Sequence, residues 1–214
     1  MIDFYATRLL TALVCSAWLA PVSATAVPQN VVTSLLAHAE LVRQGSVPAP
    51  PAGVQDMQWQ QLYPVNWKPG KILDQLGVGK LQDDDPQAPS IMAKISRAWQ
   101  AAPVMSKPID GAVRLTGFAV MPKAAADASD TVILVPYYGA CIHTPPPPSN
   151  QMVLVKLKQK IPTTMYQFPI WVTGKLLVKS SSTEHGRVAY RIDNATWEPY
   201  PYLKYPIPKY QLPR

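Results

Sequence analysis

The spacing of apolar residues divides the chain into a helical part and a strand-rich part. Residues 29–44 carry apolar side chains at helical spacing, and a second amphipathic helix is predicted over 91–101. A Pro- and Ala-rich stretch, 46–53, separates the first helix from the rest of the chain and is typical of a linker. From Asp110 onward the apolar period falls from about 3.6 residues to 2, which indicates strands.

Between the two predicted helices, residues 56–64 are expected to form one turn of helix. Trp59, Leu62 and Trp67 are predicted to anchor this segment by packing onto the body of the protein.

Five segments after Asp110 have the alternation or the β-branched run of a strand: 113–120, 131–135, 153–157, 170–178 and 188–192. The first and the fourth contain an internal glycine, Gly117 and Gly174. We expect a bulge or sharp bend at Gly117, where the apolar face switches. The sequence thus predicts a mainly β fold, a small five-stranded barrel of the oligonucleotide/oligosaccharide-binding (OB) type, because closure removes exposed strand edges. An open β-sandwich is the alternative.

Four regions emerge from these patterns. Residues 1–26 are predicted to be a signal peptide, 27–109 an N-terminal helical and loop extension, 110–198 the barrel-like domain, and 199–214 a proline-rich tail. The tail alternates proline with tyrosine and lysine, so it is expected to be extended and unable to form a core by itself.

The beginning of the chain has the pattern of an export signal. Arg8 precedes an apolar run, 9–19, that is short for a membrane-spanning helix, and small residues then offer a cleavage site after Ala26. We therefore expect a soluble exported protein, periplasmic in a Gram-negative bacterium. Cleavage would remove Cys15 and leave Cys141 as the one cysteine of the mature chain, which excludes an intrachain disulfide.

The net charge of +7 changes the range of partners only slightly. No dense block of Lys and Arg with interleaved aromatic residues occurs, so nucleic acid is not an expected partner. An exported basic protein could lie near anionic lipid headgroups or an acidic partner, or its surface could simply be basic.

The candidate chemistry lies in one segment, 135–148, which contains Cys141, His143 and four consecutive prolines, 145–148. If this loop is extended, Cys141 and His143 project from the same side and reach one ion. Zn²⁺ and Cu⁺ both accept a thiolate and an imidazole. A third ligand could come from His185, from Glu184 or from a partner chain. The alternative is that Cys141 is a buried cysteine acting as a small apolar residue.

An enzyme is a competing interpretation that the residues disfavour. Cysteine and histidine can form an acyl-transfer pair, but neighbours two residues apart on an extended loop lie parallel, and His185 would have to be the base. The sequence has no Gly-rich phosphate loop, no HExxH motif and no nucleophile elbow. We therefore predict no catalytic activity, and the sequence identifies no small-molecule substrate.

Residues 134–151, with the sequence LVPYYGACIHTPPPPSNQ, resemble the signature of a bacterial exported family known as domain of unknown function 3299. Further stretches are similar to the same family: 59–64, 113–118, 169–174 and 190–192. The resemblance extends from about Trp59 to Glu198 and does not include the leading helix or the tail. It implies a periplasmic protein often encoded beside an ABC-type transporter, in some bacteria under zinc-responsive control, and it implies no established activity.

These observations lead to two hypotheses. The first is an accessory protein of an envelope ABC-type transporter that handles zinc through Cys141 and His143, with His185 as the third ligand. The second is a non-catalytic interaction module in which prolines and aromatic residues dock onto another envelope protein and Cys141 is buried.

Overall fold

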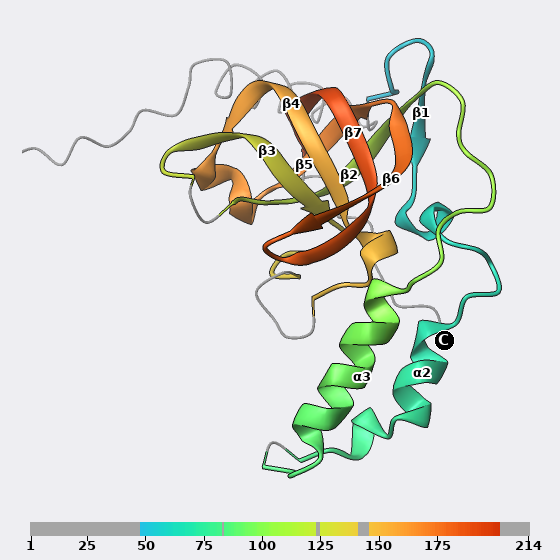
Figure 1. Ribbon diagram of the computed structural model, residues 1–214. Coiled ribbons are helices and arrows are strands. Elements are labelled where there is room, and N and C mark those ends of the chain that lie inside the picture. The colour runs from blue at the N-terminus through green and yellow to red at the C-terminus, as the bar shows by residue number, and fades with distance from the viewer. Residues whose placement is uncertain (1–47, 83, 123–124, 141–145, 202–214) are drawn as a thin grey trace, which may run out of the picture.

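The computed structural model describes residues 48–82, 84–122, 125–140 and 146–201, and its seven strands form one connected sheet (Figure 1). The strands are β1 (Val54–Met57), β2 (Ala112–Val120), β3 (Ala128–Val135), β4 (Val153–Pro162), β5 (Pro169–Gly174), β6 (Leu176–Thr183) and β7 (Gly186–Pro199). The α-helices are α2 (Pro69–Gln75) and α3 (Ala88–Gln100). Short 3₁₀ helices are η1 (Trp59–Leu62), η2 (Val78–Lys80), η3 (Ser149–Gln151) and η4 (Thr163–Gln167). The prediction of a mainly β protein is confirmed.

Five of the strands pair in a closed ring. The order is β2, β3, β4, β7 and β5, and β5 pairs again with β2. All of these pairings are antiparallel except that of β4 with β7, which is parallel. The interior of the ring is filled by apolar side chains that include the fully buried Leu115, Val155, Ile170 and Ile192. Burial of such side chains is the main favourable contribution to the stability of the ring.

The predicted number of strands is wrong in two places. The segment 170–178 was expected as one strand, but it divides at Lys175 into β5 and β6, which pair with different parts of β7. Gly174 lies at this division, and a Cβ there would be 2.5 Å from Cγ2 of Ile192 in β7, so glycine lets the end of β5 lie close to β7. The second difference is β1, which pairs in parallel with β2 and comes directly after the predicted linker.

Of the bulge or sharp bend expected at Gly117, the bulge is not present. The pairing of β2 with β5 continues in register from Val113 to Phe118. Gly117 is instead required by close packing, because a Cβ at this position would be 2.6 Å from the backbone oxygen of Val135.

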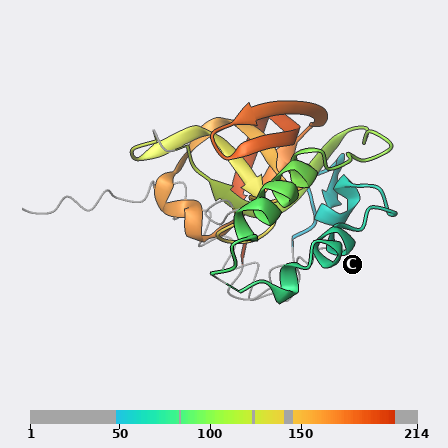
Figure 2. The ribbon, with the colours of Figure 1, turned by 60° about the horizontal axis from the view of Figure 1, so that its bottom comes forward.

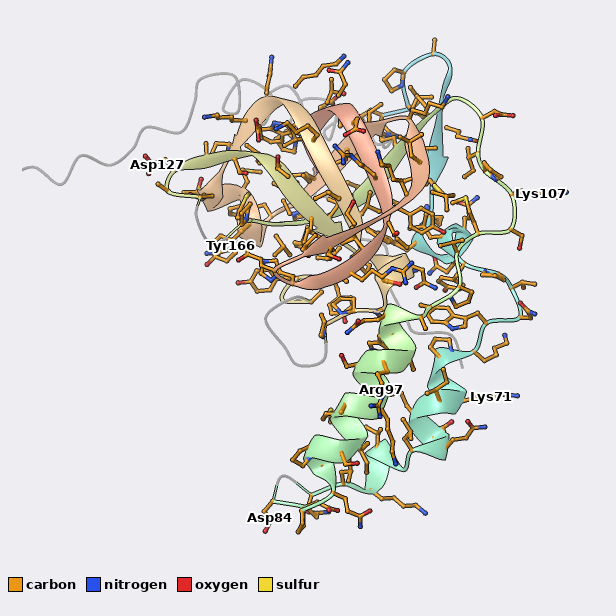
Figure 3. The ribbon with its side chains drawn as sticks, in the orientation of Figure 1. Lys71, Asp84, Arg97, Lys107, Asp127 and Tyr166 are labelled. Atoms are coloured by element: carbon orange, nitrogen blue, oxygen red, sulfur yellow. The ribbon has the colours of Figure 1, made fainter. Side chains whose placement is uncertain are left out.

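Both α-helices extend from the same end of the strand ring (Figures 1 and 2). Helix α3 confirms the predicted amphipathic helix and buries Ile95 and Trp99, while its other face is largely exposed. Asp84 lies at the far tip of this helical part, away from the strands (Figure 3). None of the helices formed by the described residues is long and apolar enough to cross a membrane.

The anchor residues of the extension behave as predicted at two positions. The segment that was expected as one helical turn is the end of β1 followed by η1, and it buries both Trp59 and Leu62. The indole Nε1 of Trp59 donates a hydrogen bond of 2.7 Å to the backbone oxygen of Thr116 in β2. Trp67 is half-buried and packs edge-on against Tyr63. The predicted helix 29–44 lies outside the described residues.

Candidate functional site

The candidate site lies around the connection between β3 and β4. Cys141 and His143, the first two predicted metal ligands, lie outside the described residues. His185, the third, lies in the tight turn between β6 and β7. The structure therefore locates one predicted ligand directly and the two ends of the segment that carries the others.

Both ends of that segment are anchored in the protein. Ala140, the residue before Cys141, is buried in a small apolar cluster with Val135, Met152 and Val188. At the other end, Pro147 and Pro148 are buried and lead directly into η3.

Polar side chains of η3 fix this second end to the helical part of the chain. Nδ2 of the fully buried Asn150 donates 2.8 Å to the backbone oxygen of Pro103, and Nε2 of Gln151 donates 3.3 Å to that of Trp59. These two donor bonds tie η3 to the preceding part of the chain, whereas Oδ1 of Asn150 and Oε1 of Gln151 are buried with no hydrogen-bond partner among the described residues. The sequence pattern singled out the prolines but missed the role of this Asn-Gln pair.

The turn that carries His185 lies against the second end of the same segment. The backbone of Gly186 has a φ angle of +111°, a conformation that residues other than glycine rarely adopt. A Cβ built at Gly186 would be 3.7 Å from Cγ of Pro146, which is ordinary van der Waals contact. His185 is thus next in sequence to a residue whose backbone lies close to Pro146, the first described residue after His143.

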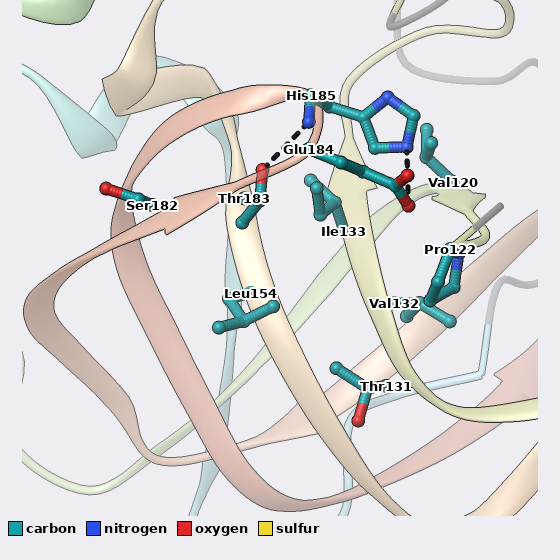
Figure 4. Close-up of a pocket in the computed structure, with 10 residues that line it drawn as sticks. All are labelled: Val120, Pro122, Thr131, Val132, Ile133, Leu154, Ser182, Thr183, Glu184 and His185. Carbon is teal, nitrogen blue, oxygen red and sulfur yellow. Dashed lines mark hydrogen bonds and ion pairs between the residues drawn. The ribbon is translucent and has the colours of Figure 1, made fainter. Parts of the chain in front are cut away.

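The imidazole of His185 is mostly buried and has an unused nitrogen. Its side chain is 15% exposed, and Nε2 is buried without a hydrogen-bond partner among the described residues. The nearest carboxylate oxygen, Oε1 of Glu184, is 3.6 Å from Nε2, too far for a hydrogen bond (Figure 4). An imidazole nitrogen in this state can accept a proton, donate one or bind a metal.

The turn itself is held by its own threonine. Oγ1 of Thr183 donates 2.7 Å to the backbone oxygen of Gly186 and accepts a hydrogen bond of 3.2 Å from the backbone N–H of His185. These two bonds close the turn and fix the direction in which His185 leaves the backbone. The alternation of apolar and polar residues in the flanking strands gave no indication of this role of Thr183.

No group of three or more His, Cys, Asp or Glu side chains that could hold a metal comes together within the described parts of the chain. A metal site at His185 would need further ligands from outside the described residues, such as Cys141 and His143, or from a partner chain. His185 with Glu184 alone supplies two donors, fewer than the three protein ligands of an open zinc site.

An exposed group of aromatic side chains lies on the other side of Ala140. Tyr137, Tyr138, Tyr166 and Phe168 are all exposed, and the neighbouring pair Tyr138 and Tyr166 is called the aromatic surface. Tyr138 is 52% exposed, and its ring centroid is 6.1 Å from that of Tyr166 and 6.0 Å from that of the buried Phe118. Desolvation, together with the charge and hydroxyl of Tyr166, raises the pKa of Tyr138.

Comparison with known proteins assigns the chain to a family. No curated protein matches it. The crystal structure of a DUF3299 family protein from Pseudomonas aeruginosa PAO1 is similar, with a TM-score of 0.51 and 29% sequence identity over 77% of this chain and 99% of that chain. The model of the family described as "Protein of unknown function (DUF3299)" matches residues 59–199. The resemblance seen in the Cys-His-proline segment is thereby confirmed, and the chain belongs to the DUF3299 family.

Proposed function

We propose that the chain is an exported periplasmic accessory protein of an envelope ABC-type transporter, and that it handles zinc through Cys141, His143 and His185. The observation that carries the metal part is the closeness of the two segments, since a Cβ built at Gly186 would lie 3.7 Å from Cγ of Pro146. His143 and Pro146 are three residues apart, and a chain spans at most about 3.6 Å per residue, so their Cα atoms are within about 11 Å. This limit is compatible with a shared site with His185.

The state of His185 supports the same proposal. Zinc is bound by neutral imidazole nitrogen and by thiolate, and His185 has a buried nitrogen without a partner in the described part of the chain. Three protein ligands would leave one coordination position for water or for a ligand of the receiving protein, which suits transfer of the ion rather than permanent storage. Glu184, 3.6 Å from His185, is the alternative third ligand.

We also propose that the ring of strands is a small barrel of the OB type. Two features support this: the five-membered ring with β2 paired to both β3 and β5, and the single parallel pairing between β4 and β7. The connection from β3 to β4, which carries the candidate site, then opens at one end of the barrel.

Metal analysis and zinc titration of the full chain test the metal part of the proposal. We expect one zinc ion per chain, with strongly reduced affinity in Cys141→Ser, His143→Ala and His185→Ala. His38→Ala is the matched control, because the sequence places His38 on the polar side of a predicted helix outside the site. Equal zinc content in the wild type and all four variants would contradict the proposed metal role.

The transporter part has a separate test in the native host. Deletion of the gene should slow growth when zinc is scarce, and the His38→Ala protein should restore growth while Cys141→Ser should not. Normal growth of the deletion strain at limiting zinc would contradict this part of the proposal.

The aromatic surface favours a second candidate, a non-catalytic interaction module. Exposed aromatic side chains are enriched at protein interfaces, and Tyr138 and Tyr166 lie next to each other here. In this case Cys141 is buried and resists thiol reagents in the native protein. Rapid labelling of Cys141 that zinc prevents would instead support the metal site.

A further inference from the structure

We propose that a cavity between the β6–β7 turn and strands β2, β3 and β4 binds a small neutral alcohol or phenol with an apolar body of one ring or a short branched chain. The cavity has a volume of about 210 Å³. Its walls are mainly the side chains of Val120, Val132, Ile133 and Leu154, and Glu184 and His185 lie at one end (Figure 4).

The size and lining of the cavity determine the size and polarity of the main part of the ligand. A dry cavity of about 150 Å³ lined by aliphatic side chains is large enough to bind benzene. A cavity of about 210 Å³ therefore accommodates a single ring with one additional small group. The aliphatic side chains on its walls favour an apolar body through the hydrophobic effect.

The polar end of the cavity determines which polar group the ligand carries. Nε2 of His185 and Oε1 of Glu184 are 3.6 Å apart and are not hydrogen-bonded to each other. Nε2 is closed to solvent, so a hydroxyl reaches it only when the Glu184 side chain, which is 37% exposed, turns aside. The hydroxyl oxygen then accepts a hydrogen bond from Nε2–H and donates one to the carboxylate. One hydroxyl group thus provides the buried nitrogen with a partner.

The threonines of the lining already have partners. Oγ1 of Thr183 is occupied by the turn, and Oγ1 of Thr131 donates to Asp130 at 2.9 Å. Ser182 also lines the cavity, and Figure 4 shows its hydroxyl directed away from His185, so the specificity for a head group rests mainly on Glu184 and His185.

The same two residues disfavour charged heads. A carboxylate at this position would be repelled by the Glu184 carboxylate. An ammonium group would pair with Glu184 but would lose its hydration next to aliphatic walls, which is costly for a charge. A neutral hydroxyl avoids both penalties.

This proposal does not depend on the zinc site. Both proposals use the buried Nε2 of His185, so zinc and the alcohol would compete for it, but the alcohol needs neither Cys141 nor His143. Cys141→Ser, which would break the proposed zinc site, should leave alcohol binding unchanged, so the two proposals can fail separately.

Benzyl alcohol is the probe, titrated into the ¹⁵N-labelled full chain and followed by NMR chemical shifts. We expect shifts at the lining residues, and at least tenfold weaker binding in Leu154→Trp, which fills the cavity. Val178→Trp is the matched control, since Val178 is 46% exposed on β6 and does not line the cavity. His185→Ala should weaken binding about fivefold to tenfold, the loss expected for one hydrogen bond.

Benzoate distinguishes the proposed head from a purely apolar site. It should bind at least tenfold more weakly than benzyl alcohol to the wild type, and the difference should shrink in Glu184→Gln. Equal affinity for the two probes in the wild type, or unchanged benzyl alcohol binding in His185→Ala, would overturn the proposal. If circular dichroism shows that Leu154→Trp does not fold, the His185→Ala and Glu184→Gln pair decides.

Discussion

Asp56 holds the guanidinium of Arg114 with both of its carboxylate oxygens, Nε to Oδ1 at 2.6 Å and Nη2 to Oδ2 at 2.8 Å. The two residues face each other in the parallel register of β1 and β2. Arg114 is only 5% exposed, and its guanidinium also lies 4.2 Å from the ring centroid of Trp171. Nη2 donates a further bond of 2.8 Å to the backbone oxygen of Pro48. This one cation therefore attaches the N-terminal edge strand to the ring.

Removal of the carboxylate in Asp56→Ala should destabilise the protein by about 2 kcal/mol. The buried guanidinium would lose two charge-assisted hydrogen bonds, each of which contributes up to a few kcal/mol. We expect less than the roughly 3–5 kcal/mol of a fully buried pair, because the Asp56 side chain is about half exposed. The measurement is the free energy of unfolding in urea.

Asp193→Ala is the control for this variant. Asp193 accepts a hydrogen bond of the same length, 2.6 Å, from Arg191, but both side chains are partly exposed. Exposed pairs contribute little, so the loss should be below about 1 kcal/mol. Equal losses in the two variants would show that burial of Arg114 does not matter.

The buried hydroxyl of Tyr190 should also contribute to the stability of the folded protein. It accepts a hydrogen bond of 2.7 Å from the backbone N–H of Met105 and donates one to the backbone oxygen of Leu62. Tyr190→Phe leaves both buried groups without a partner, so we expect a loss of about 2 kcal/mol in urea unfolding. Tyr63→Phe should change stability by less than about 0.5 kcal/mol, because the buried hydroxyl of Tyr63 has no hydrogen-bond partner among the described residues.

The free energy of unfolding should also fall at high pH, because the hydroxyl of Tyr190 ionises. Burial raises its pKa to about 12 in the folded protein, although the Met105 N–H lowers it slightly. An unfolded tyrosine has a pKa of about 10, so between these values the unfolded chain has released the proton and the folded chain still holds it. The free energy of unfolding must therefore decrease from about pH 10 to about pH 12. The difference between wild type and Tyr190→Phe should narrow over this range, and a constant difference would contradict the assignment.

Periodicity alone was sufficient for the mainly β fold and for helix α3. A run such as Thr131 to Val135 has the β-branched composition of a covered strand, and Ile95 and Trp99 share a helical face. Such patterns report which face of an element is buried, and this information is local. The family was also evident from sequence, because the Cys-His-proline segment is specific.

Pairing between distant strands could not be predicted in the same way. Strand β1 has four residues and exposes two of them, so it has no apolar alternation to recognise. Its place is fixed by Asp56 and Arg114, which are 58 residues apart in the sequence. The proximity of His185 to the candidate segment could likewise not be derived from the pattern, because it depends on how the start of β7 lies against Pro146, 40 residues earlier in the sequence.

Gly117 provides a test of how tightly β2 packs against its neighbours. A Cβ there would be 2.6 Å from the backbone oxygen of Val135 and 2.9 Å from Cγ of Leu134. A backbone oxygen in a sheet cannot move without breaking the ladder, so Gly117→Ala should destabilise by about 2–3 kcal/mol. Gly79→Ala, with no atom within 4 Å of the new Cβ and no positive φ, should be neutral or stabilise by up to about 1 kcal/mol. Urea unfolding compares the two, and a tolerated Gly117→Ala would show that the glycine serves chain flexibility rather than strand packing.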